Sequence, residues 1–159
     1  MFCIVATDQN RGIGKSGELL AHLPGDLKYF KEKTAGKTVI MGYNTLLSLP
    51  KSRPLPNRRN IVLCHLPDVR VEGAEVCHTV EEVLELVKDL PTDDVAVMGG
   101  GMVYQTFLPY CDKALITEID ASWDADTFFP PLDGFTLVSR SEPQRDGDIT
   151  YTFCIYERK

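Results

Sequence analysis

Apolar runs rich in β-branched residues alternate with stretches of helical spacing along most of the chain. Strands are predicted over residues 2–7, 38–41, 61–64, 75–77, 95–98 and 113–119, and helices over 23–34, 44–49, 79–87 and 101–108. Because strands joined through helices run parallel, this alternation predicts one α/β domain over residues 1–159. We expect a mainly parallel, mixed β-sheet of about eight strands, with about four helices flanking its two faces.

The C-terminal region has a different pattern. Two long strands are predicted over 135–141 and 149–157, with strict alternation in the second and an Asp146-Gly147 turn between them. This combination predicts an antiparallel hairpin at the edge of the sheet. Two helix starts also carry cap signals: Asn44 for the short helix, and a capping box from Thr79 to Glu82.

Composition limits the classes of partner. The chain has 159 residues, with 17 basic and 23 acidic side chains and a formal net charge of −6. Surplus negative charge disfavours nucleic acid and anionic membranes as partners. No run resembles a membrane span, and the N-terminus lacks the basic region of a signal peptide. The five scattered cysteines form no C-x-x-C pair and the three histidines show no metal-ligand spacing, so we expect buried thiols, no metal and a cytoplasmic setting.

Three consecutive glycines, Gly99-Gly100-Gly101, lie between an apolar strand and a helix. Without Cβ atoms a ligand can approach the backbone closely, and the helix N-terminus suits a phosphate. A tight turn without a ligand is the alternative. The G-x-G-x-x-G pattern fails because Tyr104 replaces its last glycine, so a standard Rossmann site is disfavoured although Glu118 lies at a suitable distance.

Asp26 follows Leu-Pro-Gly at the start of a helix and allows two interpretations. It is either a first-turn carboxylate favoured by the helix dipole, or a carboxylate desolvated by Leu23, Leu27 and Phe30. In the second case its pKa rises, which suits proton chemistry or a charge-assisted bond to a cationic ring. The local pattern does not decide between them.

Two basic segments also allow two interpretations each. Residues 10–17 contain three glycines and form either a surface loop or a mobile lid. Arg53, Arg58 and Arg59 surround two prolines, and they are either solvated or form a fixed fork for a carboxylate or phosphate.

Taken together, these segments resemble the dihydrofolate reductase family, in its bacterial chromosomal type. Each fragment is weak alone, but their joint order is specific and spans essentially the whole chain. The matching segments are the first strand ending at Ala6, then 12–14, 23–27 with Phe30, 39–42 with Thr45, 53–58, 98–101 with 103–104, 117–120 and 126–130.

The resemblance implies NADPH-dependent reduction of 7,8-dihydrofolate to 5,6,7,8-tetrahydrofolate, by hydride transfer with protonation of a ring nitrogen. Asp26 would hold the amino-pyrimidine edge of the pterin, Thr117 would share its hydrogen bonds, and Leu19 would lie near the nicotinamide in the lid. The implied substrate-binding residues are Ile4, Ala6, Leu27, Phe30, Leu49, Arg53, Leu55, Arg58, Met98 and Thr117. The implied cofactor-binding residues are Ala6, Ile13, Gly14, Lys15, Gly42, Tyr43, Asn44, Thr45, Leu63, Cys64, His65, His78, Met98, Gly99, Gly100, Gly101, Met102, Val103, Tyr104 and Thr127. Antifolate inhibitors would bind as well, and we expect a monomer.

Three departures from the family pattern matter. The segment over 131–147 is short and differs from the family's usual final loop, and we expect this to affect the partners of the lid rather than the chemistry. Ala21 stands where tryptophan is usual, which leaves space beside the pterin. Tyr43 stands where a basic residue usually contacts the 2′-phosphate of NADPH, and His65 and His78 lie near that pocket. Because histidine is only partly charged at neutral pH, we expect a preference for NADPH that strengthens as pH falls.

Two other functions fit parts of the pattern. A pyrimidine reductase of riboflavin synthesis has a similar fold and cofactor, but gives no reason to keep Asp26 together with Arg58. A non-catalytic nucleotide-binding or phospho-receiver relative would use Asp8 at the end of the first strand. However, the strand over 39–41 ends in Gly42, where a receiver needs its phosphorylated aspartate.

Overall fold

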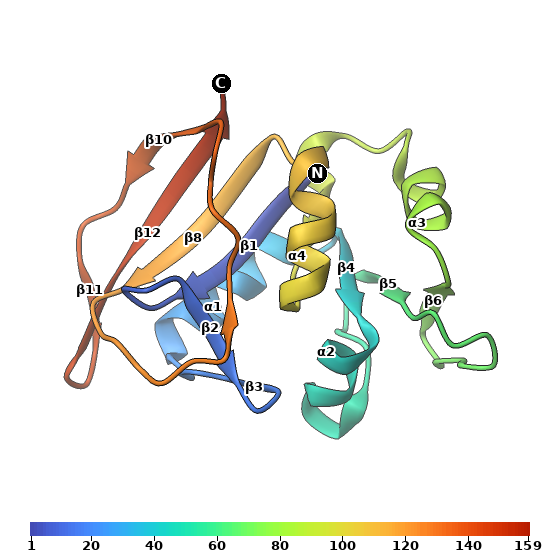
Figure 1. Cartoon of the computed structure of the whole chain (residues 1–159), viewed down its shortest axis with the longest axis horizontal. Coiled ribbons are helices and arrows are strands. Elements are labelled where there is room, and N and C mark those ends of the chain that lie inside the picture. The colour runs from blue at the N-terminus through green and yellow to red at the C-terminus, as the bar shows by residue number, and fades with distance from the viewer.

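The parallel strands predicted from the alternating pattern lie side by side in one sheet. The computed structural model describes residues 1–159, which form a nine-stranded mixed sheet and a separate three-stranded sheet (Figure 1). The large sheet runs in the order β10 (Phe135–Arg140), β12 (Ile149–Arg158), β8 (Lys113–Ile119), β1 (Phe2–Thr7), β7 (Val95–Val97), β4 (Thr38–Gly42), β5 (Arg59–Leu63) and β6 (Ala74–Cys77), and β11 (Gln144–Asp146) pairs with β12. Strands β8 to β6 are parallel, and β12 is antiparallel to β8 and β10, so the predicted α/β fold is confirmed.

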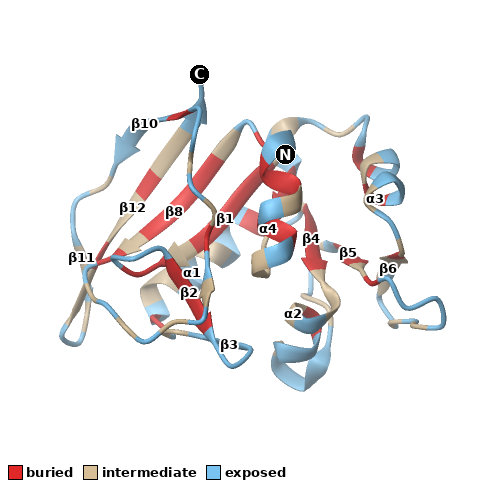
Figure 2. Ribbon diagram, viewed as in Figure 1, coloured by how far each residue is buried: buried red, intermediate tan, exposed pale blue.

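Helices cover both faces of this sheet. The helices are α1 (Pro24–Thr34), α2 (Tyr43–Ser48), α3 (Val80–Val87) and α4 (Gly101–Phe107), with short 3-10 turns η1 (Pro50–Ser52), η2 (Thr92–Asp94) and η3 (Leu108–Tyr110). Successive strand residues point to opposite faces, so Cys3 packs with α3 and α4 while Ile4 packs with α1 and α2. Burial is concentrated in the central strands (Figure 2). No helix is long and apolar enough to cross a membrane.

Two predicted caps need correction. Helix α2 begins at Tyr43 with Gly42 as its N-cap residue, so Asn44 lies inside the helix and does not cap it. The Gly42 N–H donates to the Gly99 carbonyl (2.9 Å), which turns the chain directly from β4 into the helix. Half of the capping box is confirmed: Thr79 Oγ1 accepts from the Glu82 N–H (3.2 Å). The Glu82 carboxylate, however, accepts from the N–H of His78.

The segment after β1 contains strands that the sequence did not predict. β2 (Gly12–Lys15) pairs with β3 (Glu18–Leu19) and with β9 (Thr127–Phe128) to form the small sheet. At the C-terminus, β10 and β12 form the predicted antiparallel pair, but the turn at 146–147 joins β11 to β12.

All five cysteines are buried free thiols. Two of them lie close together: the Sγ atoms of Cys3 on β1 and Cys111 after η3 are 3.4 Å apart.

Candidate active site

A carboxylate and a hydroxyl from distant parts of the chain meet at the start of α1. Asp26 lies in the first turn of this helix, and Thr117 lies on β8, in register with Ala6 of β1. The Thr117 hydroxyl donates to Asp26 Oδ1 at 2.5 Å. Since Thr117 is buried, its hydroxyl has a fixed direction and orients the carboxylate.

The surroundings of Asp26 favour its protonated form. Burial raises the pKa of this carboxyl, the hydrogen bond from Thr117 lowers it, and the negative charge of Asp146 raises it again, with a net upward shift. The structure thereby favours the second interpretation of Asp26, a desolvated carboxylate suited to proton chemistry.

Apolar side chains line the sheet face next to this pair. Ile4 belongs to the core cluster on that face, and several predicted substrate residues pack against the same cluster. These are Phe30, Leu49, Leu55 and Met98. Leu27 on α1 is 49% exposed, while Ala6 packs against a smaller cluster formed by Leu23, Ile119 and Tyr151.

Arg58 is held at three points. Its Nε donates to Thr34 Oγ1 (2.9 Å), its Nη1 donates to the Pro56 carbonyl (3.1 Å), and its guanidinium lies 5.9 Å from the centre of the Phe30 ring. Burial lowers the pKa of Arg58, but a guanidinium stays charged at any ordinary pH. A groove of 840 Å³ brings together Arg58, Arg53 and Leu55 with Tyr43. This arrangement supports a fixed fork for a carboxylate.

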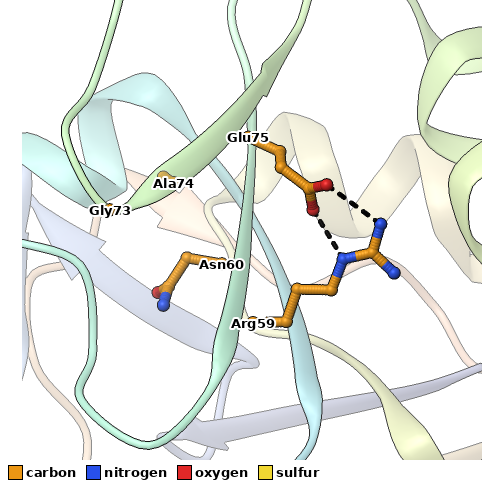
Figure 3. Close-up of a pocket in the computed structure, with 5 residues that line it drawn as sticks. All are labelled: Arg59, Asn60, Gly73, Ala74 and Glu75. Carbon is orange, nitrogen blue, oxygen red and sulfur yellow. Dashed lines mark hydrogen bonds and ion pairs between the residues drawn. The ribbon is translucent and has the colours of Figure 1, made fainter.

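Arg59 does not share that role. It points into a separate hollow of 320 Å³ at β5 and β6, where its Nε and Nη2 donate to the Glu75 carboxylate at 2.5 and 3.1 Å (Figure 3). The pairing with Glu75 neutralises its charge.

The fold itself requires two of the three consecutive glycines. Gly99 has φ +126°, a conformation that L side chains rarely adopt. A Cβ on Gly101 would lie 2.7 Å from Thr127 Cγ2. The glycine run therefore does not by itself demonstrate a ligand. The N-terminus of α4 has no side-chain cap, however, so its first N–H groups fit a phosphate.

Most of the predicted cofactor residues gather at one edge of the sheet. They follow the carboxyl ends of four neighbouring parallel strands, where open α/β sheets bind ligands. The groups are 98–104 after β7, 42–45 after β4, 63–65 at the end of β5, and His78 after β6.

Individual side chains within this edge differ in exposure. Met102 is 83% exposed, whereas Val103, Tyr104 and Cys64 are buried. The Tyr104 hydroxyl donates to the Ile4 carbonyl at 2.8 Å, so this hydrogen bond links α4 to β1. His78 Nδ1 lies 2.7 Å from the Cys64 carbonyl, which can only accept, so this nitrogen carries the proton.

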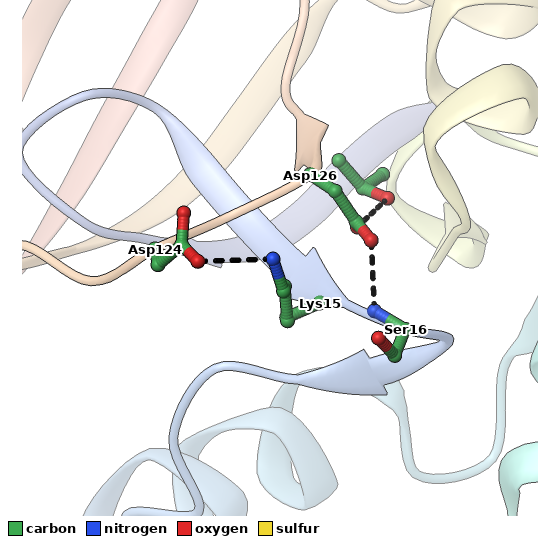
Figure 4. A network of polar contacts seen from close by, with 5 residues as sticks. Lys15, Ser16, Asp124 and Asp126 are labelled. Atoms are coloured by element: carbon green, nitrogen blue, oxygen red, sulfur yellow. Dashed lines mark hydrogen bonds and ion pairs between the residues drawn. The ribbon is translucent and has the colours of Figure 1, made fainter.

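The small sheet is fastened to the segment that precedes β9 (Figure 4). The Asp126 carboxylate accepts from the Ser16 N–H (2.9 Å), the Asp126 N–H donates to the Gly14 carbonyl (3.0 Å), and Lys15 pairs with Asp124 (3.0 Å). The Ser16 N–H and the Thr127 hydroxyl, which both donate to the Asp126 carboxylate, lower its pKa. Ile13 is buried in the core cluster that also holds Val103 and Tyr104 of α4. Leu19 on β3 is 59% exposed and stays a predicted nicotinamide neighbour.

Two acids considered from the sequence have other partners. Asp8 accepts backbone N–H groups from Asn10 (2.9 Å), Gly12 (2.8 Å) and Trp123 (3.0 Å), so it anchors the segment after β1. Glu118 binds Tyr156 and Arg140, so its carboxylate is already engaged. Sequence reasoning missed Asp126 and Asp146 as anchors, because their partners lie more than a hundred residues away.

Ala21 and Trp123 pack against the same small cluster of Leu23, Ile119 and Tyr151. A small side chain, Ala21, therefore stands where the family usually has tryptophan. The single tryptophan of this chain, Trp123, reaches the same region from another loop.

Fold and site together define an α/β protein with a ligand edge at the carboxyl ends of parallel strands and an orientated, partly buried carboxylate beside it. A dihydrofolate reductase family model matches residues 1–158. The chain belongs to the dihydrofolate reductase family.

Individual relatives agree. The dihydrofolate reductase of Bacillus subtilis is 38% identical over 160 residues, which cover 98% of this chain and 93% of that protein. Dihydrofolate reductase type 3 of Salmonella typhimurium is 41% identical over 150 residues, covering 93% and 90%. The solved dihydrofolate reductase of Enterococcus faecalis, complexed with NADP(H) and RAB-propyl, superposes with a TM-score of 0.90 at 37% identity, covering 99% of this chain and 95% of that one.

Proposed function

We propose that this chain reduces 7,8-dihydrofolate to 5,6,7,8-tetrahydrofolate with NADPH. The observation that carries the proposal is the hydrogen-bonded pair of Asp26 and Thr117, in which the carboxyl is desolvated and has a raised pKa. The family match favours this reaction over the pyrimidine reductase and over a non-catalytic relative.

In this proposal, Asp26 binds the amino-pyrimidine edge of the pterin and favours a proton on the neighbouring imine nitrogen. Thr117 keeps the carboxylate in the plane that this contact needs. Because the carboxylate is only partly solvated, a charge-assisted bond to a protonated ring is stronger there than in water. Bound NADPH supplies the hydride for the adjacent ring carbon.

The other residues position the two ligands. Arg58 is proposed to bind the glutamate carboxylate of the substrate, with Arg53 nearby. The apolar wall of Ile4, Phe30 and Leu49 would exclude water from the ring. The N-terminus of α4 and the turn before it fit the cofactor phosphates, because no side chain occupies those N–H groups.

Direct assay tests the reaction. Purified protein is mixed with NADPH and dihydrofolate, and the loss of the reduced nicotinamide absorbance is followed. We expect turnover that depends on both compounds. Absence of turnover in the wild-type protein would reject the proposal.

We also propose that the enzyme works as a monomer on small molecules, including antifolate inhibitors, in the cytoplasm and without nucleic acid. The net charge of −6 and the five buried free thiols support this setting. Light scattering after size exclusion tests the monomer, and a mass of twice 17.8 kDa would contradict it.

A further inference from the structure

Helix α1 does not cap its own N-terminus. Its N-cap residue is Leu23, which makes no side-chain cap bond, and Pro24 has no N–H. The first N–H group of the helix is that of Gly25, and it donates to Asp146 Oδ2 at 2.9 Å. Since Asp146 ends β11, the cap reaches α1 from the C-terminal part of the sheet.

Tyr151 holds Asp146 in this position. The Tyr151 hydroxyl, on β12, donates to the same oxygen of Asp146 at 2.9 Å, and the residue is only 3% exposed. The contact is so close that a Cβ on Gly25 would lie 2.0 Å from the Tyr151 hydroxyl oxygen. Residue 25 must therefore be glycine for the helix start, the carboxylate and the phenol to meet.

Asp146 brings a second negative charge next to Asp26, which follows Gly25 directly. Asp146 raises the pKa of Asp26, whereas the hydrogen bond from Thr117 lowers it. The other ionisable groups around the Asp26 carboxyl are the phenols of Tyr29 on α1, Tyr104 on α4 and Tyr151 on β12. Each of these phenols has a raised pKa and is neutral at the pH of an assay. Among these surrounding groups, Asp146 is therefore the charged one.

We propose that Asp146 is a positioning residue for the reaction: its carboxylate, held by the Tyr151 hydroxyl, fixes the first turn of α1 through the Gly25 N–H and places a second negative charge beside Asp26. This inference rests on the proposed function, since Asp26 is the group that would interact with the pterin. The same charge would also favour the protonated ring. In the complex, Asp26 is the carboxylate and the ring carries the proton, so the charge keeps this one proton on the pair to higher pH and extends activity toward neutral pH.

Asp146→Asn separates charge from geometry. The amide keeps an Oδ acceptor for the Gly25 N–H and the Tyr151 hydroxyl but loses the negative charge. In the ligand-free protein, we expect the pKa of Asp26, followed by carbon NMR of its carboxyl, to fall by on the order of half a pH unit. The pH profile of kcat/KM should move the same way.

Asp148→Asn is the matched control. Asp148 belongs to the same turn and the substitution removes the same charge, but its side chain is fully exposed and lies 3.8 Å from Arg145. We expect neither the Asp26 titration nor the pH profile to move. Equal shifts in the two variants, or no shift in Asp146→Asn, would overturn the role of the charge.

Asp146→Ala tests the positioning role, because it also removes the acceptor for Gly25. The start of α1 carries Leu27 and Phe30, so we expect KM for dihydrofolate to rise roughly 3- to 10-fold above that of Asp146→Asn. A KM equal to that of Asp146→Asn would refute this role. The NMR titration needs no substrate, so it tests the charge even in a protein without dihydrofolate turnover, and absence of turnover would count against the proposed function alone.

Discussion

Asp26→Asn is the most direct test of the chemistry derived from the site. Asparagine has the same shape and keeps an Oδ acceptor for the Thr117 hydroxyl, which now donates at 2.5 Å, but it cannot carry the charge. The carboxyl is desolvated, so the lost interaction with a protonated ring is of the charge-assisted kind. We expect kcat/KM near neutral pH to fall by roughly 10²- to 10³-fold, or about 2.7 to 4 kcal/mol of barrier.

The pH dependence distinguishes this cause from a general loss of structure. In acid, the substrate arrives already protonated, and each unit of lower pH raises its protonated fraction about tenfold while it is still mostly neutral. The deficit of Asp26→Asn should therefore shrink by a similar factor per unit until it levels off. The measurement is kcat/KM for dihydrofolate across pH, with the exposed Asp133→Asn as the control for a lost charge. A deficit that is constant across pH would refute the reasoning.

The same substitution should increase stability. The pKa of Asp26 is raised in the folded protein, so the folded state holds the proton more tightly than the unfolded chain does. The free energy of unfolding contributed by this group is complete in acid and is lost as pH rises through the folded pKa. Asparagine does not ionise, so at neutral pH we expect a gain on the order of 0.5–1 kcal/mol that disappears in acid. Thermal unfolding at both pH values measures it, and a less stable variant at neutral pH would be the opposite result.

Arg58→Leu should raise KM for dihydrofolate roughly 10- to 100-fold with little change in kcat, because it removes a charge-assisted contact to the substrate, while Arg59→Leu should change KM little. Equal effects of the two would contradict the assignment of the fork. Ala21→Trp should alter the rate of hydride transfer in single-turnover experiments, and unchanged kcat/KM together with unchanged antifolate affinity would sink that idea. Asp126→Ala removes the acceptor for the Ser16 N–H, so we expect this amide to exchange its hydrogen faster and kcat to fall several-fold. Unchanged exchange would show that this hydrogen bond does not hold the lid segment over 10–17 closed.

The large sheet could be predicted because its signals are local. Runs such as 2–7 and 38–41 are apolar, short and separated by helical spacing, and the parallel order follows from that alternation. The small sheet could not be predicted, because Gly12 and Gly14 carry no strand propensity and β2 is defined by its partners β3 and β9. The Asn44 cap was wrong for a similar reason, since the Gly42–Gly99 hydrogen bond decides where α2 begins.

For the site, too, local features could be predicted and contacts between distant residues could not. Asp26 was visible as a candidate, but two interpretations stayed open because its partner Thr117 lies 91 residues away. Asp146 was recognised only as part of a turn, although its carboxylate contacts Gly25, at a separation of 121 residues. A sequence pattern reports on neighbours within a few residues, whereas the charge on a group depends on everything that folds against it.

Strand β12 lies between β8 and β10. Its Tyr151 hydroxyl donates to the Asp146 carboxylate, which accepts the Gly25 N–H at the start of α1. The sheet is therefore completed by a strand that follows both of its neighbours along the chain. A nascent chain that has reached only β8 would expose the edge of that strand, which is the kind of edge that recruits other chains. We expect that assembly of the site waits until β12 has been made and has paired with β8.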